Sequence, residues 1–223
     1  MAFKKLKTKC ENMIEDIKLL IKNPKIGLNT IANARQKVKF YNHLSEIMFN
    51  QPYYWLYSQA KPHTILIDIG AFIGDTTVYF AMNPNIDKVI AYEPHPDTFR
   101  ILSENVKSMP EPVSSKIILK NVAITDKEGH VTNNMKEITG TNKTVKSKNG
   151  IRSKILKKEL QGFNNIIIKS DCEGGEYQIF KNIEDLKNVY AIQMEYHKGY
   201  SALEEVLKRG GGHLNACIHQ KEN

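Results

Sequence analysis

From Thr64 onward, short runs rich in β-branched residues alternate with segments of helical periodicity. The β-rich runs are TILIDI (64–69), KVIAYE (88–93), KIILKNVAI (116–124), NIIIKSD (165–171) and VYAIQME (189–195). The helical segments are DTTVYFAM (75–82), PDTFRILSENVK (96–107), EYQIFKN (176–182) and SALEEVLKR (201–209). This alternation predicts βαβ units, and so a Rossmann-like α/β fold with a mostly parallel sheet and helices on both faces. Ligands bind such sheets at the carboxyl ends of the strands.

The segment before Thr64 has a different pattern. Apolar residues recur at helical spacing over 10–22 and 31–48, and the aromatic segment PYYWLYSQA predicts a third short helix. We therefore predict a helical extension over residues 1–61 and a catalytic domain over residues 62–223. The extension could close over a substrate, mediate a homodimer or cover a sheet edge, and the sequence leaves these roles open.

An insertion at about 131–160 interrupts the alternation. AITDKEGHV (123–131) predicts a hairpin turned at 126–129, and the polar, basic stretch 133–150 predicts a mobile loop. SKILKKELQG predicts a short helix capped by Ser153. The insertion contains 8 Lys and Arg against 2 Asp and Glu, and residues 1–61 contain 11 against 4. Such basic segments could attract nucleic acid or acidic substrates, or could simply be solvated surface.

Composition excludes several classes of protein. With 41% hydrophobic and 25% charged residues, the 223-residue chain is typical of one globular α/β domain with a modest appendage. Its apolar runs are too short to cross a bilayer, and acidic residues near the amino terminus disfavour a signal peptide. The 3 cysteines lack CxxC spacing, which disfavours disulfides and zinc. We therefore expect a cytoplasmic protein without membrane partners.

The first β-rich run ends in IDIGAFIGDTT, where Asp68, Gly70 and Gly74 form a DxGxxxG pattern at a strand-to-helix turn. Glycines there let the backbone approach a ligand closely. A dinucleotide fingerprint would need glycine at Phe72, and a P-loop would need lysine at Asp75. A ligand with an adenosine, a charged amino acid and no phosphate suits this turn better, and S-adenosyl-L-methionine is such a ligand.

The ends of the next two runs complete a predicted cofactor site. The carboxylate of Glu93 can accept hydrogen bonds from both ribose hydroxyls, and Asn121, Val122 and Ala123 could flank an adenine. A glycine turn after a strand-end Asp is also common as plain structure. The predicted cofactor-binding residues are Asp68, Gly70, Ala71, Gly74, Glu93, Pro94, Asn121, Val122, Ala123 and Asp171.

The fourth run leads into IIIKSDCEGGEY, the densest cluster of charged residues at a strand end. The cluster contains Lys169, Asp171, Glu173 and Glu176, and the fifth run adds Glu195 and His197. Charged groups so close together perturb one another's pKa, as proton transfer requires. The candidate catalytic residues are Lys169, Asp171, Glu173 and His197. The alternative is a capped helix start, with Glu176 in the first turn; no metal is required, although Asp171, Glu173 and Glu195 could hold magnesium.

These segments resemble the FkbM-type family of S-adenosylmethionine-dependent methyltransferases. The resemblance covers roughly residues 64–200 and is most specific in the KxDxEGxE pattern formed by Lys169, Asp171, Glu173, Gly174 and Glu176. It implies O-methylation of a hydroxyl on a small molecule, glycan or natural product. Ser170 and Cys172 depart from the bulkier aliphatic residues usual in the family. HLNACIH (213–219) is one strand candidate where the related sheets close with an antiparallel pair.

Two other functions remain open from the sequence alone. An RNA methyltransferase would use the basic segments to contact phosphates, although these lack interleaved aromatic residues for base stacking. A non-catalytic binding module would keep the cofactor fold without turnover. The acidic residues at the strand ends disfavour the binding module, and the missing aromatic residues disfavour the RNA methyltransferase. A small-molecule or glycan acceptor is what the family resemblance implies.

Overall fold

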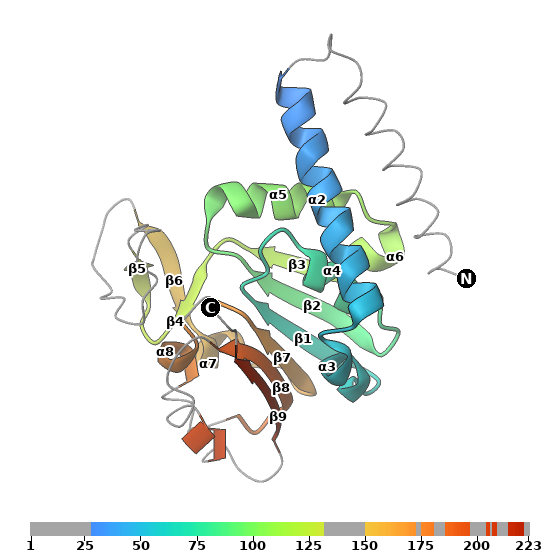
Figure 1. Cartoon of the computed structure of the whole chain (residues 1–223). Coiled ribbons are helices and arrows are strands. Elements are labelled where there is room, and N and C mark those ends of the chain that lie inside the picture. The colour runs from blue at the N-terminus through green and yellow to red at the C-terminus, as the bar shows by residue number, and fades with distance from the viewer. Residues whose placement is uncertain are drawn as a thin grey trace. The chain divides into compact units, whose positions relative to one another are not determined.

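The computed structural model describes residues 28–131, 150–172, 175–180, 186–196, 204–205, 207–208 and 214–220 (Figure 1). The chain divides into two compact units, Met1–Gln51 and Pro52–Asn223. In the first unit, α2 spans Leu28–Asn50 and confirms the helix predicted over 31–48. The helix predicted over 10–22 lies outside the described residues. The proposed domain boundary at 61/62 stays a prediction.

The second unit is built on a parallel sheet, which confirms the predicted Rossmann-like α/β fold. Its strands run in the order β3-β2-β1-β7-β8-β9, and every neighbouring pair is parallel (Figure 1). The bounds are β1 Thr64–Ile69, β2 Ile86–Tyr92, β3 Ile117–Lys120, β7 Ile166–Ser170, β8 Val189–Tyr196 and β9 Asn215–Gln220. The edge strand β9 pairs with β8 in parallel, so the described part of this sheet has no antiparallel closing pair.

Helices cover both faces of the sheet. On one face α4 (Asp75–Ala81) packs on β1, β2 and β3, α3 (Tyr54–Gln59) packs on β7 and β8, and the rings of Tyr57 and Tyr79 join the two helices at 4.7 Å. Alternate strand residues, such as Ile67 and Ile168, form a buried core on the other face with residues of α7 (Leu156–Glu159) and α8 (Glu176–Phe180). Two further helices are α5 (Pro96–Lys107) and α6 (Glu111–Ser114).

A small second sheet corrects three predictions about residues 116–162. The run KIILKNVAI divides at 121–122, because β3 joins the large sheet and β4 (Ala123–Thr125) the small one. The predicted hairpin is wrong, because β4 and β5 (Gly129–Val131) both pair with β6 (Ile151–Ile155), which lies between them. Ser153 is not a helix cap: it lies in β6 and its hydroxyl donates to the Lys127 carbonyl oxygen at 2.9 Å. The predicted mobile loop falls mostly on 132–149, outside the described residues.

Candidate functional site

A row of three buried polar side chains crosses the face of the sheet covered by α3 and α4. Asp68 of β1 pairs in register with Lys169 of β7, and Lys169 with Gln193 of β8. All three are at most 2% exposed. Because side chains on successive residues of a strand alternate between faces, these registered residues project to the same side. We call Asp68, Lys169 and Gln193 the polar row.

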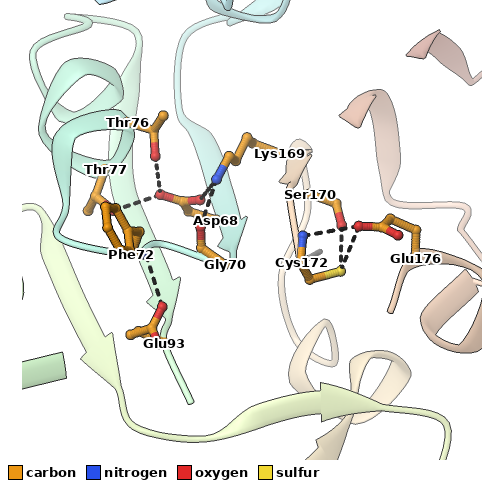
Figure 2. Close-up of polar contacts among 10 residues, drawn as sticks. All are labelled: Asp68, Gly70, Phe72, Thr76, Thr77, Glu93, Lys169, Ser170, Cys172 and Glu176. Atoms are coloured by element: carbon orange, nitrogen blue, oxygen red, sulfur yellow. Dashed lines mark hydrogen bonds and ion pairs between the residues drawn. The ribbon is translucent and has the colours of Figure 1, made fainter. Parts of the chain in front are cut away.

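Asp68 connects the polar row to the start of α4. Its Oδ2 accepts hydrogen bonds from Thr77 Oγ1 at 2.6 Å and from Thr76 Oγ1 at 3.1 Å (Figure 2). From the described residues its Oδ1 accepts no well-directed hydrogen bond, but Lys169 Nζ lies 3.1 Å from it. The carboxylate thus fixes the first helical turn after the glycine-rich segment and is balanced by a buried cation.

Lys169 is bonded to the glycine turn. Its Nζ donates to the Gly70 carbonyl oxygen at 2.8 Å (Figure 2). Burial alone would lower the pKa of Lys169, but the Asp68 carboxylate outweighs this effect, so the pKa rises above its usual range. Lys169 therefore remains charged at neutral pH. In this geometry its contacts position the turn.

The glycine turn passes very close to the end of β7. Gly70 has φ +78, and a Cβ atom on it would lie 1.9 Å from the Asp171 carbonyl oxygen. The amides of Gly70 and of the buried Ala71 both donate to the Tyr92 carbonyl oxygen, at 3.1 and 3.0 Å. Gly74 precedes α4 with φ +94, where a Cβ would lie 2.5 Å from Leu102 Cδ1. Gly70 is therefore required by close packing against backbone as well as by its conformation, whereas Gly74 is required mainly by its positive φ, because the Leu102 methyl ends a flexible side chain.

Glu93 joins the end of β2 to the same turn. Its Oε2 accepts from the Phe72 amide at 3.0 Å, and its Oε1 accepts from the His95 amide at 2.9 Å. Burial raises the pKa of Glu93, although the two amide hydrogen bonds oppose this rise. Each carboxylate oxygen has a second lone pair, so Glu93 can still accept a hydrogen bond from a ligand hydroxyl.

The predicted adenine-flanking residues follow β3. Asn121 Nδ2 donates to the carbonyl oxygens of Glu93 and Pro94, at 2.9 and 3.0 Å, and so ties the end of β2 to the end of β3. Val122 and Ala123 are buried, and Val122 belongs to the hydrophobic core. The structure thus brings Glu93, Pro94 and Asn121 together beside the glycine turn, whereas Val122 contributes mainly to packing.

Asp171 lies beyond the end of β7, opposite the glycine turn. Its amide donates to the Ile69 carbonyl oxygen at 3.0 Å. Its Oδ1 is buried and has no hydrogen-bond partner among the described residues. A buried carboxylate oxygen without a donor is rare in folded proteins, because desolvation then goes uncompensated. The atom is therefore a candidate ligand contact.

The remaining acidic residues of the motif divide between capping and undescribed positions. Glu176 Oε1 accepts from the Cys172 amide at 3.1 Å and from Cys172 Sγ at 3.3 Å, which closes the turn before α8 (Figure 2). Burial, followed by the nearby Glu176 carboxylate, raises the pKa of the Cys172 thiol well above its usual range. Glu176 thus matches the alternative of a capped helix start. Glu173 and His197 lie outside the described residues.

Two residues near the site carried no motif in the sequence. Gln193 lies in the middle of a β-rich run. Tyr53 precedes α3, and its ring centroid lies 6.0 Å from Lys169 Nζ. The aromatic composition of 53–57 was the one indication of a special role for that segment.

Within the described part of the chain, no group of three or more His, Cys, Asp and Glu side chains is placed to hold a metal ion. None of the described helices is long and apolar enough to span a membrane.

Comparisons with known proteins identify the family. No curated protein matches the chain significantly. Among solved structures, methyltransferase FkbM from Methylobacillus flagellatus KT is similar with a TM-score of 0.40 and 14% identity, covering 68% of this chain and 40% of that one. A precorrin-6y C5,15-methyltransferase from Geobacter metallireducens GS-15 is similar with a TM-score of 0.40 and 14% identity, and the match covers 77% of this chain and 69% of that one. The family model of the methyltransferase FkbM domain matches residues 68–209, and the chain belongs to this methyltransferase family.

Proposed function

We propose that this methyltransferase uses S-adenosyl-L-methionine and methylates a hydroxyl oxygen on a small molecule, glycan or natural product. The observation that carries the cofactor proposal is the buried Asp171 Oδ1, which no described residue supplies with a donor; the backbone of Asp171 lies against the Gly70 turn. An ammonium group can donate a hydrogen bond to such a carboxylate oxygen. The acceptor class rests on the family resemblance and on the chemistry of the strand ends.

The residues present fit this cofactor. Gly70 and Ala71 would let the ligand approach the backbone, and the free lone pairs of Glu93 would accept the ribose hydroxyls. Asn121, Val122 and Ala123 would lie toward the adenine, and Asp171 would accept from the ammonium group. The Asp68–Lys169 pair would affect the cofactor only indirectly, because Asp68 already bonds to the start of α4 and Lys169 to the glycine turn.

S-adenosylmethionine, when bound, supplies an activated sulfonium methyl group, whose carbon–sulfur bond breaks as a carbon–oxygen bond to the acceptor forms. The chain's own contribution is to align the acceptor and to remove its hydroxyl proton. Asp171, Glu173 and His197 remain the candidates for receiving that proton. Lys169 is a poor candidate, because its raised pKa and its two contacts keep it protonated.

Calorimetry with S-adenosylhomocysteine tests the cofactor. We expect the product to bind and to raise the melting temperature, because a ligand selective for the folded state stabilises that state. Glu93→Ala should weaken binding by about tenfold or more, since it removes hydrogen bonds to a charged acceptor. Glu104→Ala is the matched control, because that carboxylate is exposed on α5 and pairs with Arg100. Binding of NAD without binding of S-adenosylhomocysteine would contradict the proposal.

Isotope transfer tests the acceptor. The protein is incubated with methyl-labelled S-adenosylmethionine and, separately, with a small-metabolite extract, a glycan extract and RNA. We expect label in an oxygen-linked methyl group of a metabolite or glycan. Label in RNA, with binding that weakens steeply as salt rises, would favour the RNA alternative. Product binding without transfer to any fraction would favour the binding-module alternative.

A further inference from the structure

Tyr53 is fixed to the candidate site by the polar row. It lies in the second compact unit, before the region 68–209 that the family model matches. Gln193 Nε2 donates to the Pro52 carbonyl oxygen at 2.9 Å, and Gln193 Oε1 accepts from the Leu56 amide at 3.3 Å. One buried side chain of β8 therefore holds the backbone on both sides of Tyr53.

The Tyr53 side chain lies beside the charged members of the row. Its ring centroid is 6.0 Å from Lys169 Nζ and 6.3 Å from the centroid of the Phe80 ring. Burial raises the pKa of Tyr53 far above its usual range; Lys169 opposes this rise, and the carboxylates of Asp171, Glu195 and Asp68 add to it. The hydroxyl therefore stays protonated at neutral pH and can donate a hydrogen bond.

Tyr53 and Asp171 present complementary groups in one neighbourhood. Within the described part of the chain, the Tyr53 hydroxyl has no hydrogen-bond acceptor, and Asp171 Oδ1 has no donor. The two do not bond to each other, although each influences the other electrostatically. A ligand that carries both a carboxylate and an ammonium group would satisfy both. Its ammonium would offset the charge of Asp171, as Lys169 already offsets that of Asp68.

We propose that Tyr53 and Asp171 bind the zwitterionic amino-acid end of the cofactor, the Tyr53 hydroxyl donating to its carboxylate and Asp171 Oδ1 accepting from its ammonium group. This inference rests on the proposed function, because it takes S-adenosylmethionine as the cofactor. It makes the segment before the matched region a part of the cofactor site.

Calorimetry with three nucleosides tests this inference on the full chain. S-adenosylhomocysteine has the complete amino-acid end, S-adenosyl-3-thiopropylamine lacks the carboxylate, and 5′-methylthioadenosine lacks both charged groups. Tyr53→Phe should weaken binding of S-adenosylhomocysteine alone, by about 10- to 100-fold, the value of one hydrogen bond to a charged group. Asp171→Asn should weaken binding of S-adenosylhomocysteine and of S-adenosyl-3-thiopropylamine, which both carry the ammonium group, and leave binding of 5′-methylthioadenosine unchanged.

Tyr57→Phe is the matched control. Tyr57 lies in α3, the helix that Tyr53 precedes, and its ring packs against Tyr79, so the variant also loses one hydroxyl and keeps its ring. We expect it to bind all three nucleosides like the wild type. A Tyr53→Phe variant that binds S-adenosylhomocysteine as tightly as the wild type, or that binds all three nucleosides equally weakly, would overturn the inference and leave the proposed cofactor standing. A wild-type protein that binds none of the three would overturn both.

Discussion

Glu159 offers a direct test of the electrostatics that join the two sheets. Its side chain is 6% exposed, yet it accepts hydrogen bonds from Lys154 Nζ at 2.7 Å, from the Tyr92 hydroxyl at 2.8 Å and from Lys120 Nζ. These donors come from β6, β2 and β3, and Glu159 itself lies in α7. One carboxylate therefore connects the large sheet, the small sheet and a helix.

Replacing Glu159 by glutamine keeps the shape and removes the charge. Burial alone would raise the pKa of Glu159, but the hydrogen bonds from Lys120, Lys154 and Tyr92 lower it from 4.5 to about 2. That difference corresponds to about 3 kcal/mol in favour of the folded carboxylate. The two lysines are 31% and 36% exposed and can turn partly toward water, so we expect Glu159→Gln to cost about 2–3 kcal/mol of unfolding free energy.

Urea denaturation at pH 7 measures this loss, and a pH series tests its cause. Because the folded-state pKa lies below the unfolded value, the stabilisation is complete above pH 4.5 and disappears as the pH falls toward 2. The difference between wild type and Glu159→Gln should therefore shrink over that range. It should stay constant between pH 6 and 8.

Glu128→Gln is the control, because the Lys158–Glu128 pair has a similar distance, 2.8 Å, but side chains that are 56% and 46% exposed. An exposed pair of this kind contributes at most about 1 kcal/mol. Equal losses of unfolding free energy in the two variants would refute the reasoning. So would a loss in Glu159→Gln that is as large at pH 3 as at pH 7.

Two further predictions concern the glycine turn and the polar row. Gly70→Ala should destabilise the chain by more than about 3 kcal/mol in urea denaturation, because φ is +78 and the new Cβ would lie 1.9 Å from the Asp171 carbonyl oxygen. Gly162→Ala is the control: its φ is +82 but the space around it is open, so it should cost only about 1–2 kcal/mol. A similar cost for both would contradict the close packing. Lys169→Met should cost about 3–5 kcal/mol by leaving Asp68 buried without its cation, and adding Asp68→Asn should recover part of that loss. A double variant less stable than Lys169→Met would count against the pairing.

The elements with strong local patterns were predictable from the sequence. The run TILIDI became β1 with the predicted bounds, because four of its six residues are Thr or Ile, which favour strands, and the strand is buried almost throughout. The segment 96–107 became α5 with the predicted bounds, because Pro96 opens the helix and the His95 side chain caps it by accepting from the Thr98 amide at 3.4 Å. Here local chemistry and tertiary packing favour the same structure.

The small sheet was not predictable, because its pairing is non-local. AITDKEGHV has the alternation and turn residues of a hairpin, but β6 lies between β4 and β5 in the sheet. In the sequence, 19 residues separate the end of β5 from the start of β6, and β6 alternates weakly. Ser153 precedes a helical segment and so has the pattern of a cap, yet its hydroxyl satisfies the Lys127 carbonyl oxygen. Local patterns define candidate strands but do not state which strands pair.

The candidate site was predictable where one strand end supplies the residue. Asp68 and Glu93 lie near the ends of β-rich runs, and Gly70 comes directly after one. The parallel sheet brings those strand ends together. Tyr53 and Gln193 were missed, because their relation to the site depends on the register of β7 with β8 and on where α3 packs. No spacing in the sequence encodes either of these contacts.

Strand alternation explains why the charged motif at the end of β7 divides into two functions. Lys169 and Asp171 are two residues apart, so an extended chain directs both toward the side of the sheet that carries Asp68. Lys169 is still within the strand, where it is buried and paired. Asp171 lies past the strand end, where its Oδ1 has no partner among the residues that the structure describes. Cys172 has the opposite parity and packs against the hydrophobic core, where Glu176 accepts from its amide and thiol. One side of the motif therefore holds the turn and faces the proposed ligand, while the other starts α8.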